Sequence, residues 1–532
     1  MAVSDRQAAT KAAGVVSFAV MLSRILGLVR DQCFAALFGA GRGMDAFVIA
    51  FRLPNLLRDL FAEGALSIAF VTTFSRKIAV EGDRSAWSLA SKVATLTAVF
   101  MSVVSLLGIV FASPLVAFLA SGFPLEKREL TVGLTQIMYP FILLVSLAAL
   151  VMGMLNAKNR FAIPALASCF FNIGSIVGGV GIGYFLDPKF GDRALTGLAI
   201  GTLIGGLLQL AVQLPSLKSV GFRFRPDFQW RDKGVAEVLY LMAPAVIAAS
   251  AVQVNVMVNG WFASHLGDGP VSWLNYSFRL VQLPLGVFGV AISTVTLPVI
   301  SKSAALKDVT NFRSTLARAL RLAFFLTIPS TIGLVVLARP IIRVLFERGH
   351  FSQHATLETA SVLQYYTVGL AAYAGIKVLA PAFYALNKQH TPMLIGLFSI
   401  GLNLLLNWLF TFQLRFGPRG LALSTGLVAV TNFLLYYVMM RSHSRRLETS
   451  RLIDSFVRIL LAAAVMGGIC WAGNRYWISG IHNQLLEIVA LISVIVVSGL
   501  VYLGITYLFK IEEGHDIFVI LKRRFLKHPQ NA

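Results

Sequence analysis

The sequence predicts an all-α integral membrane protein that crosses the bilayer many times. Hydrophobic residues make up 57% of its 532 residues and charged residues only 13%, whereas soluble globular domains are about 45–50% apolar and about 25% charged. Long apolar stretches recur along the whole chain, and crossing the hydrocarbon core of a bilayer takes roughly 20 such residues. We therefore exclude a water-soluble fold and expect fourteen transmembrane helices.

Charge clusters separate the apolar stretches and set the expected limits of each helix. Four stretches contain no charged residue at all: 93–125, 130–157, 194–217 and 488–509. The fourteen spans are expected near 13–39, 44–74, 93–120, 131–157, 161–186, 194–217, 238–264, 270–301, 322–338, 359–386, 390–414, 420–440, 459–474 and 486–509.

The distribution of basic residues predicts how the chain lies in the membrane. The net charge is +22, from 46 Lys and Arg against 24 Asp and Glu. With fourteen spans, 29 basic residues fall on the side of the two termini and 11 on the opposite side. Basic residues concentrate in cytoplasmic loops, so both termini are expected in the cytoplasm. The same observation argues against nucleic-acid binding, because the charge lies between apolar spans. The basic, amphipathic tail after Lys510 is expected to lie along the inner leaflet.

Short sequence matches indicate an internal duplication. Residues 51–53 (FRL) recur at 278–280, and similar matches at 112–114, 159–164 and 197–202 recur 223 to 228 residues later, in the same order. Each half then holds six spans in one orientation, a parallel repeat found in transporters with the binding site between the halves. We expect an N-terminal lobe at 1–233, a C-terminal lobe at 234–446 and an added helix pair with the tail at 447–532.

Glycine and proline add two local expectations. Gly197, Gly201 and Gly205 form small-xxx-small repeats that favour close helix packing, as do Gly174 and Gly178. Proline residues interrupt the duplicated spans two and eight, and broken helices suit the lining of a cavity. These prolines are Pro54, Pro284 and Pro298.

Six basic residues lie within expected spans, which is the unusual feature of the sequence. An arginine at the bilayer centre costs about 2.5–3.5 kcal/mol on insertion scales, so it is kept only where it faces protein, water or a partner charge. Two pairs with a spacing of six residues lie about 9 Å apart along their helices. Guanidinium groups converging from both halves would suit an anionic group with several oxygens, such as a phosphate. The six are Arg24, Arg30, Arg52, Arg58, Arg279 and Lys377.

Internal pairing is the alternative for these charges. Spans one and two also contain Asp31, Asp45, Asp59 and Glu63. We expect Asp59 to point away from its neighbour Arg58 on a helix, and Asp45 to lie at a span end in contact with water. Arg279 is harder to neutralise, because residues 270–301 contain no acid and Gln282 is its nearest polar neighbour. Lys377 is either a second-half contributor or a residue whose amine reaches the interface.

Motifs for enzymatic chemistry are missing where they would be needed. The chain contains no P-loop glycine run followed by Lys and Ser or Thr, so ATP hydrolysis is not expected. A membrane enzyme acting on a lipid would need acid, base or nucleophile groups on an outer loop. The longest expected outer loop, 339–358, offers only Glu347, Glu358 and two histidines. We expect the protein not to be an enzyme.

Motifs at 23–27 (SRILG), 45–47 (DAF), 52–58 (RLPNLLR) and 377–381 (KVLAP) stand out along the chain. Together with several shorter motifs they resemble the MurJ (MviN) family of lipid II flippases in the MOP exporter superfamily. The most specific block covers the first two spans, and the resemblance extends over essentially the whole chain. One departure is Gln282, where some members carry Glu. The matching motifs are 23–27 (SRILG) with Arg30 and Asp31, 38–41 (FGAG), 45–47 (DAF), 52–58 (RLPNLLR), 61–65 (FAEGA), 272–273 (SW), 279–280 (RL), 286–287 (GV), 297–298 (LP), 377–381 (KVLAP) and 383–384 (FY).

The resemblance implies a MATE-like fold of two six-helix lobes and a terminal pair that forms a groove for a lipid tail. It implies transport of lipid II, an undecaprenyl diphosphate carrying a disaccharide-pentapeptide, across the bacterial inner membrane for peptidoglycan synthesis. Membrane lipids and cell-wall synthesis proteins are the implied partners. No cofactor is implied, although a monovalent cation or the membrane potential could drive export. The implied substrate-binding residues are Arg24, Arg30, Asp45, Arg52, Arg58 and Arg279, with Glu63, Gln282 and Lys377 as further candidates.

Two other transport functions stay open at this stage. A multidrug or cation-coupled exporter of the same superfamily should have an apolar, acidic cavity, whereas this one is expected to be rich in arginine. A flippase for another polyprenyl-diphosphate-linked glycan would present the same diphosphate. For the lipid II flippase we expect alternating access, in which the head group enters a cavity open to the cytoplasm and leaves on the outer side.

Overall fold

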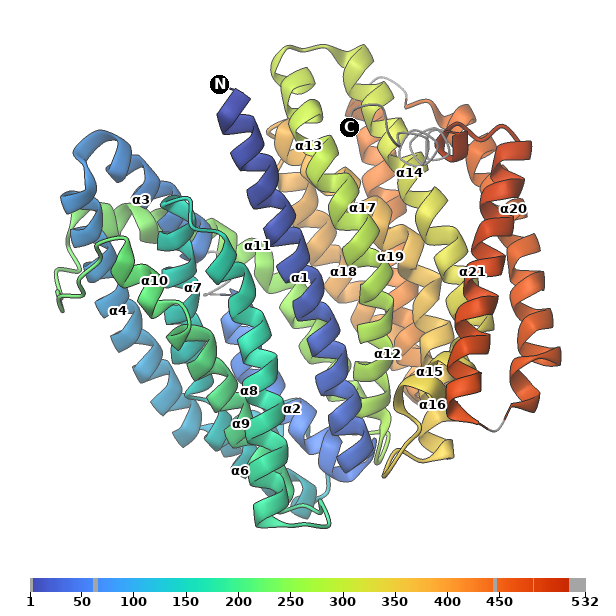
Figure 1. Ribbon diagram of the computed structural model, residues 1–532, viewed down its shortest axis with the longest axis horizontal. Helices are drawn as coiled ribbons and strands as arrows, with labels where there is room; N and C mark the ends of the chain where they lie inside the picture. The colour runs from blue at the N-terminus through green and yellow to red at the C-terminus, as the bar shows by residue number, and fades with distance from the viewer. Residues whose placement is uncertain (1–2, 61–65, 444–446, 482, 516–532) are drawn as a thin grey trace, which may run out of the picture. The chain divides into compact units, whose positions relative to one another are not determined.

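The computed structural model describes residues 3–60, 66–443, 447–481 and 483–515. Every regular element within these ranges is helical (Figure 1), which confirms the expected all-α class. Backbone contacts divide the chain into two units. Unit 1 comprises Met1–Ser272 with Arg348–Phe351, and unit 2 comprises Trp273–Glu347 with Ser352–Ala532. Glu63 and the amphipathic part of the tail lie outside the described residues.

The helices of unit 1 follow one another with short connections. They are α1 (Val3–Phe38), α2 (Arg42–Leu57), α3 (Ser67–Glu81), α4 (Asp83–Val110), α5 (Ala112–Leu119), α6 (Leu125–Met138), α7 (Phe141–Ala157), α8 (Ala162–Leu186), α9 (Ala194–Ala211), α10 (Leu214–Ser219) and α11 (Lys233–Ser264).

Unit 2 contains ten α-helices and several tighter or wider helical turns within the described residues. They are α12 (Pro270–Pro284), η2 (Leu285–Gly289), α13 (Val290–Ala305), α14 (Val309–Val336), α15 (Ala338–Phe346), α16 (Gln353–Tyr366), η3 (Thr367–Gly369), α17 (Leu370–Ala385), α18 (His390–Trp408), η4 (Leu409–Gln413), α19 (Pro418–His443), α20 (Thr449–Tyr476), η5 (Ile478–Gly480) and α21 (Gln484–Leu508). In Figure 1 the pair α20 and α21 forms one edge of unit 2, where α20 packs against α14.

Ten helical segments of the described chain are long and apolar enough to cross a membrane. They coincide with expected spans three to six and nine to fourteen, so a multi-pass membrane protein is confirmed. The other four expected spans fall on α1, α2 with α3, α11 and α12 with α13, and the count of fourteen stays a prediction. The ten segments are 83–110, 125–157, 162–186, 194–219, 309–336, 353–385, 390–413, 418–442, 449–480 and 484–508.

The exposed faces of these helices are apolar, as contact with lipid requires. On α4, Leu89 and Val93 are buried in a cluster with Phe70 and Phe74 of α3, whereas Val99, Phe100, Val103, Leu106 and Val110 are exposed. Soluble monomers rarely present contiguous apolar surface of this extent. This side of α4 is therefore suited to contact with hydrocarbon, and the packed side faces the core of unit 1.

Close packing of α8 on α9 confirms the expectation from the glycine repeats. A Cβ atom added to Gly201 would lie 2.2 Å from the backbone nitrogen of Gly179, and one added to Gly197 would lie 2.3 Å from that of Gly183. A Cβ on Gly174 would lie 2.9 Å from the Cα of Gly205. The two backbones approach so closely that alanine at any of these positions would push the helices apart.

Both spans that contain the FRL motif are broken, at slightly different places from those expected. In unit 1, α2 ends at Leu57 and a wider π-type turn follows at 58–60, four residues beyond Pro54. In unit 2, α12 ends at Pro284 and the π-type turn η2 follows at once. Pro298, by contrast, lies inside the continuous helix α13. A proline removes one backbone hydrogen bond and crowds the preceding turn, and only two of the three sites coincide with or closely precede a break.

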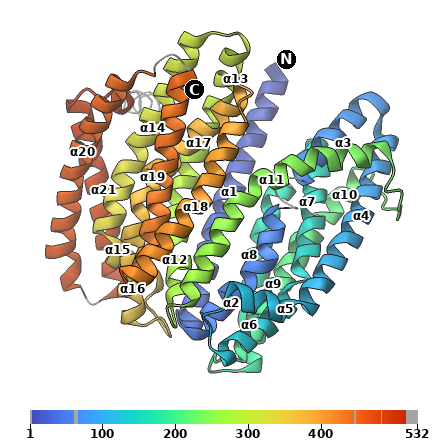
Figure 2. The ribbon, with the colours of Figure 1, turned by 180° about the vertical axis from the view of Figure 1, so that it is seen from behind.

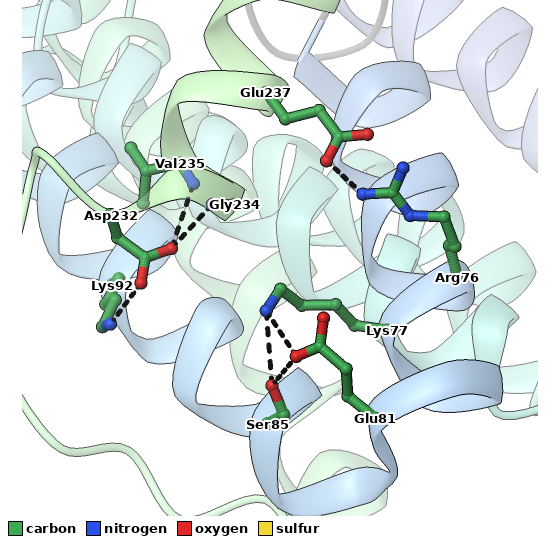
Figure 3. Close-up of polar contacts among 9 residues, drawn as sticks. All are labelled: Arg76, Lys77, Glu81, Ser85, Lys92, Asp232, Gly234, Val235 and Glu237. Atoms are coloured by element: carbon green, nitrogen blue, oxygen red, sulfur yellow. Dashed lines mark hydrogen bonds and ion pairs between the residues drawn. The ribbon is translucent and has the colours of Figure 1, made fainter.

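The long helix α11 groups with unit 1, although the expected lobe boundary lies at its first residue. It packs against α3, α4 and α5, and Figure 2 shows it starting beside α3. Its first turn is capped by Asp232, whose carboxylate accepts hydrogen bonds from the backbone N–H groups of Gly234 and Val235 (Figure 3). In the same way α20 and α21 group with unit 2. Contacts thus follow the packing of neighbouring helices, whereas the boundaries at 233 and 446 came from the repeat and stay predictions.

Candidate functional site

Arg52 lies on α2 and reaches α11 within unit 1. Its Nη1 lies 3.4 Å from the carbonyl oxygen of Val256, and its guanidinium borders a small cavity of ≈ 10 Å³. Apart from Arg52 the cavity is lined by apolar side chains and one glycine: Ile49, Leu53, Leu56, Leu119, Met257 and Gly260. This volume suits about one water molecule. The Arg52 guanidinium is therefore held against helix backbone in an apolar setting.

Gly260 provides the space that Arg52 occupies. A Cβ atom at Gly260 would lie 2.6 Å from Nη1 of Arg52, which is too close for any real contact. Because the conflicting atom is the end of a flexible side chain, a larger residue at 260 would move the guanidinium rather than the helix. Gly260 therefore sets the position of Arg52.

Arg58 pairs with its sequence neighbour Asp59, contrary to expectation. The Nε and Nη2 atoms of Arg58 lie 3.2 and 2.8 Å from Asp59 Oδ1. The expected divergence of the two side chains was wrong, because α2 ends at Leu57 and the arginine is long enough to fold back in the turn. The other oxygen, Oδ2, accepts hydrogen bonds from Asn55 and from Gln253 of α11. Asp59 thereby joins the end of α2 to α11.

The two arginines of α1 differ in their surroundings. Arg30 pairs with Asp31 at 2.9 Å, and its guanidinium lies 5.6 Å from the ring centroid of Phe171 and 6.0 Å from that of Phe34. Such a cation over aromatic faces is held firmly. Arg24 is partly buried and forms no ion pair with any acid in the described part of the chain.

Asp45 is completely buried, whereas contact with water was expected. It pairs with Lys127 at 3.0 Å and accepts hydrogen bonds from Gly269 N–H, Ser272 N–H and Ser272 Oγ at 2.7, 2.8 and 2.6 Å. The expectation failed because the connection between α11 and α12 folds over the start of α2. Gly267 and Gly269 have φ of +88° and +107°, a conformation that favours glycine. Asp45 therefore anchors this connection.

Lys127 is the main residue of this region that sequence reasoning missed. It is 1% exposed, although it was expected in an outer loop. Its amine bridges Asp45 and Asp268 at 3.0 and 2.8 Å and lies 4.1 Å from the ring centroid of Phe123. The sequence offered one signal, because an acid within a span, such as Asp45, needs a basic partner. This requirement does not distinguish Lys127 from its neighbour Arg128.

In unit 2, Arg279 and Gln282 both lie on α12. Their spacing of three residues places them on one side of the helix, and both side chains are exposed. This side of α12 faces away from the packed core, where Leu280 and Val281 are buried. An exposed guanidinium therefore lies on the helix that ends at the break after Pro284.

Lys377 of α17 lies at the same break in unit 2. Its Cδ atom is 3.1 Å from the position of a Cβ added to Gly289, the last residue of η2. The side chain is half-buried, and α17 packs against both η2 and α13. Unit 2 thus brings Lys377 to the turn that follows the helix of Arg279 and Gln282.

The basic groups in these regions are suited to anion binding. Within the described residues no group of three or more His, Cys, Asp or Glu side chains could hold a metal ion. Guanidinium and ammonium groups instead lie beside broken helices in both units. Such groups bind oxygen-rich anions through charge-assisted hydrogen bonds.

Comparison with known sequences identifies the family. The family model described as lipid II flippase MurJ matches residues 34–491. A probable lipid II flippase MurJ of Vibrio cholerae is 35% identical over 502 residues, covering 92% of this chain and 94% of that protein. The lipid II flippase MurJ of Burkholderia cenocepacia is 35% identical over 500 residues, covering 92% and 96%.

Comparison with solved structures supports the same family. A lipid II flippase MurJ in an inward closed conformation has a TM-score of 0.76 and 30% identity, covering 93% of this chain and 98% of that one. A multidrug resistance MATE family transporter of the MOP superfamily has a TM-score of 0.67 but only 14% identity, covering 83% and 99%, and this likeness shows the fold alone. The chain has the MATE-like fold, and it belongs to the MurJ family of lipid II flippases.

Proposed function

We propose that the protein is a lipid II flippase that moves the undecaprenyl-diphosphate-linked disaccharide-pentapeptide from the inner to the outer leaflet for peptidoglycan synthesis. Family membership over residues 34–491 supports this function and argues against catalysis, since the family is one of transporters. The family and the apolar helices also support a multi-pass protein of the bacterial inner membrane. We further propose fourteen spans in two parallel repeats plus a terminal pair, with both termini in the cytoplasm.

The surroundings of the arginines support the substrate assignment. Arg30 and Arg58 are paired with Asp31 and Asp59, so their charge is largely satisfied within unit 1. Arg52 instead faces a backbone carbonyl, and Arg279 is exposed on a helix in a stretch without acids. We assign Arg24, Arg52 and Arg279 to the diphosphate of lipid II, and Arg30 and Arg58 to holding the surrounding helices.

The membrane potential is the energy source that we favour for export. Moving one negative charge outward across an inside-negative membrane releases about 2.3 kcal/mol per 100 mV, and a diphosphate carries more than one. A coupled monovalent cation is the other candidate. We propose alternating access, in which the arginines neutralise the diphosphate during passage while the lipid tail remains in the bilayer.

Depletion of the protein in cells tests this function. The amount of lipid-linked precursor in the outer leaflet is measured after complementation with wild type, Arg24→Ala, Arg52→Ala or Arg279→Ala, at equal protein levels. We expect precursor to accumulate in the inner leaflet in depleted cells and with each of the three variants. Arg451→Ala serves as the control, because Arg451 is an exposed arginine that pairs with Glu448 across one turn, and it should restore export.

Two outcomes would contradict different parts of the proposal. Rescue by all three arginine variants would refute the assigned residues while leaving the function standing. Normal outer-leaflet precursor in depleted cells that lack any other flippase would refute the function itself. Export of a different polyprenyl-diphosphate glycan instead of lipid II would replace the substrate but retain the diphosphate chemistry.

A further inference from the structure

The connection between α10 and α11 carries aromatic side chains that the fold leaves uncovered. Phe224, Phe228 and Trp230 are 53%, 63% and 62% exposed, which is far more than large aromatic residues usually show. We call residues 222–231 the 222–231 loop. The aromatic residues alternate with three exposed arginines, which are Arg223, Arg225 and Arg231.

Helix α4 holds the beginning and the middle of this loop. The ring of Phe222 packs on that of Trp87, with centroids 5.3 Å apart, and Phe222 itself is buried. The backbone N–H of Asp227 donates a hydrogen bond of 3.1 Å to Thr95 Oγ1. These two contacts attach the beginning and the middle of the loop to α4.

The end of the loop is fastened by ion pairs at the first turn of α11. Figure 3 shows Lys92 of α4 bonded to Asp232, at 2.7 Å, and Arg76 of α3 bonded to Glu237. Lys92 is buried, so its pair with Asp232 is better shielded than a surface pair. The loop is thus clamped at both ends to the same part of unit 1.

The attachment points place the loop at the edge of the lipid-facing surface. Thr95 precedes Val99 by four residues, or about 6 Å along the helix, and Val99 and Phe100 begin the exposed apolar face of α4. In Figure 1 the loop lies at the periphery of unit 1, beside α4 and α10. Its aromatic side chains therefore lie close to the level at which the apolar surface starts.

We propose that the 222–231 loop is an interfacial anchor that binds anionic phospholipids of the inner leaflet. Aromatic side chains favour the boundary between head groups and hydrocarbon, and guanidinium groups bind phosphate through paired hydrogen bonds. The nearby α3–α4 turn carries Glu81, Asp83 and Arg84 but no aromatic residue, so it lacks this combination of aromatic and basic side chains. The assignment to the inner leaflet rests on the proposed function and on the orientation proposed above, with both termini in the cytoplasm.

Fluorescence of Trp230 tests the insertion. The full-length protein is placed in nanodiscs of phosphatidylcholine and phosphatidylglycerol, and the emission lost in Trp230→Phe is assigned to this residue. We expect this emission to be quenched by lipids brominated high on the acyl chain and to resist quenching by aqueous iodide. Strong quenching by iodide with no effect of brominated lipid would overturn the proposal, as would shielding from both, which would indicate a protein partner instead.

The preference for anionic lipid is tested by thermal unfolding in nanodiscs with and without phosphatidylglycerol. We expect the anionic lipid to raise the unfolding temperature of the wild type more than that of the triple variant Arg223→Gln, Arg225→Gln, Arg231→Gln. The control replaces three other exposed basic residues of unit 1, Arg84, Lys189 and Arg193, by Gln and should keep the wild-type response. Equal responses of both triple variants would overturn the assignment. Neither readout requires transport, so failure here is distinct from failure of the flippase function.

Discussion

The two broken spans, α2 with α3 in unit 1 and α12 with α13 in unit 2, start from the same short motif but use their charges differently. In the first, Asp45 is buried with Lys127, and Arg58 is paired with Asp59. In the second, Arg279 is exposed on a helix in a stretch without acids. The difference indicates that charges of the first broken span hold helices together. In the second broken span the corresponding arginine lies on the exposed side of its helix, and we propose that it binds the substrate.

The largest effect on stability is expected at the buried ion pair between Asp45 and Lys127. Lys127→Met would leave Asp45 without its cationic partner at a site with no exposed surface, and breaking a buried pair costs about 3–5 kcal/mol. We expect a strongly lowered unfolding temperature in detergent or nanodiscs. Asp268→Asn is the control, because Asp268 is exposed and contributes at most about 1 kcal/mol. Similar small losses in both variants would show that Asp45 does not anchor this region.

A functional loss with little change in stability is expected at Gly260. Alanine favours a helix over glycine by about 1 kcal/mol, but its Cβ would displace the Arg52 guanidinium. Gly260→Ala should therefore fold normally and export lipid II poorly, approaching the phenotype of Arg52→Ala. Gly181→Ala on α8 is the matched control, since nothing lies within 4 Å of a Cβ there. Full export by Gly260→Ala would show that the observed position of Arg52 is not needed.

A smaller effect on stability, with a defined pH dependence, is expected at Asp232, which caps the start of α11. Burial alone would raise the pKa of Asp232, but hydrogen bonds from Lys92 and Gly234 outweigh it, so the pKa lies below its ordinary value. Because the pKa of Asp232 is depressed in the folded state, its ionised carboxylate stabilises the fold at pH values above the unfolded-state pKa of about 3.9. This contribution is lost as the pH falls through the folded-state pKa.

Comparison of the wild type with Asp232→Asn isolates this contribution, because asparagine keeps the helix cap. The wild type should lose stability more steeply below about pH 4, by up to about 1 kcal/mol. Parallel pH profiles of unfolding temperature for the two proteins would contradict the assignment.

The smallest effect on stability is expected at Arg279. Its side chain is exposed, and substitutions at such surface positions usually change stability by no more than about 0.5 kcal/mol. Arg279→Ala should therefore unfold at nearly the wild-type temperature and still fail to restore export. A marked loss of stability would show that the second broken span also uses its arginine to hold the fold, and the contrast between the two spans would disappear.

Local sequence signals predicted much of the fold. Apolar stretches located the ten segments that are long and apolar enough to cross a membrane. The glycine repeats of 174–178 and 197–205 correctly indicated the close packing of two helices. These features depend on residues close together in the chain, which is why periodicity and composition suffice. The break after Pro284 was found in the same way.

Contacts between residues far apart in the chain could not be predicted from the sequence. Asp45 and Lys127 lie 82 residues apart, and Asp59 and Gln253 lie 194 apart, so no spacing rule connects them. The divergence expected of Arg58 and Asp59 failed for another reason, because it assumed a regular helix where the chain makes a wider turn. The basic residues near the breaks were recognisable, whereas their partners had to come from the structure.

Binding of lipid II by the purified protein tests the central claim most directly, namely that arginines of both broken spans hold the diphosphate. The affinity of the wild type is compared with that of Arg52→Ala and Arg279→Ala in identical nanodiscs. The account predicts that each substitution weakens binding at least tenfold, which corresponds to about 1.4 kcal/mol. Unchanged affinity in both variants would contradict it.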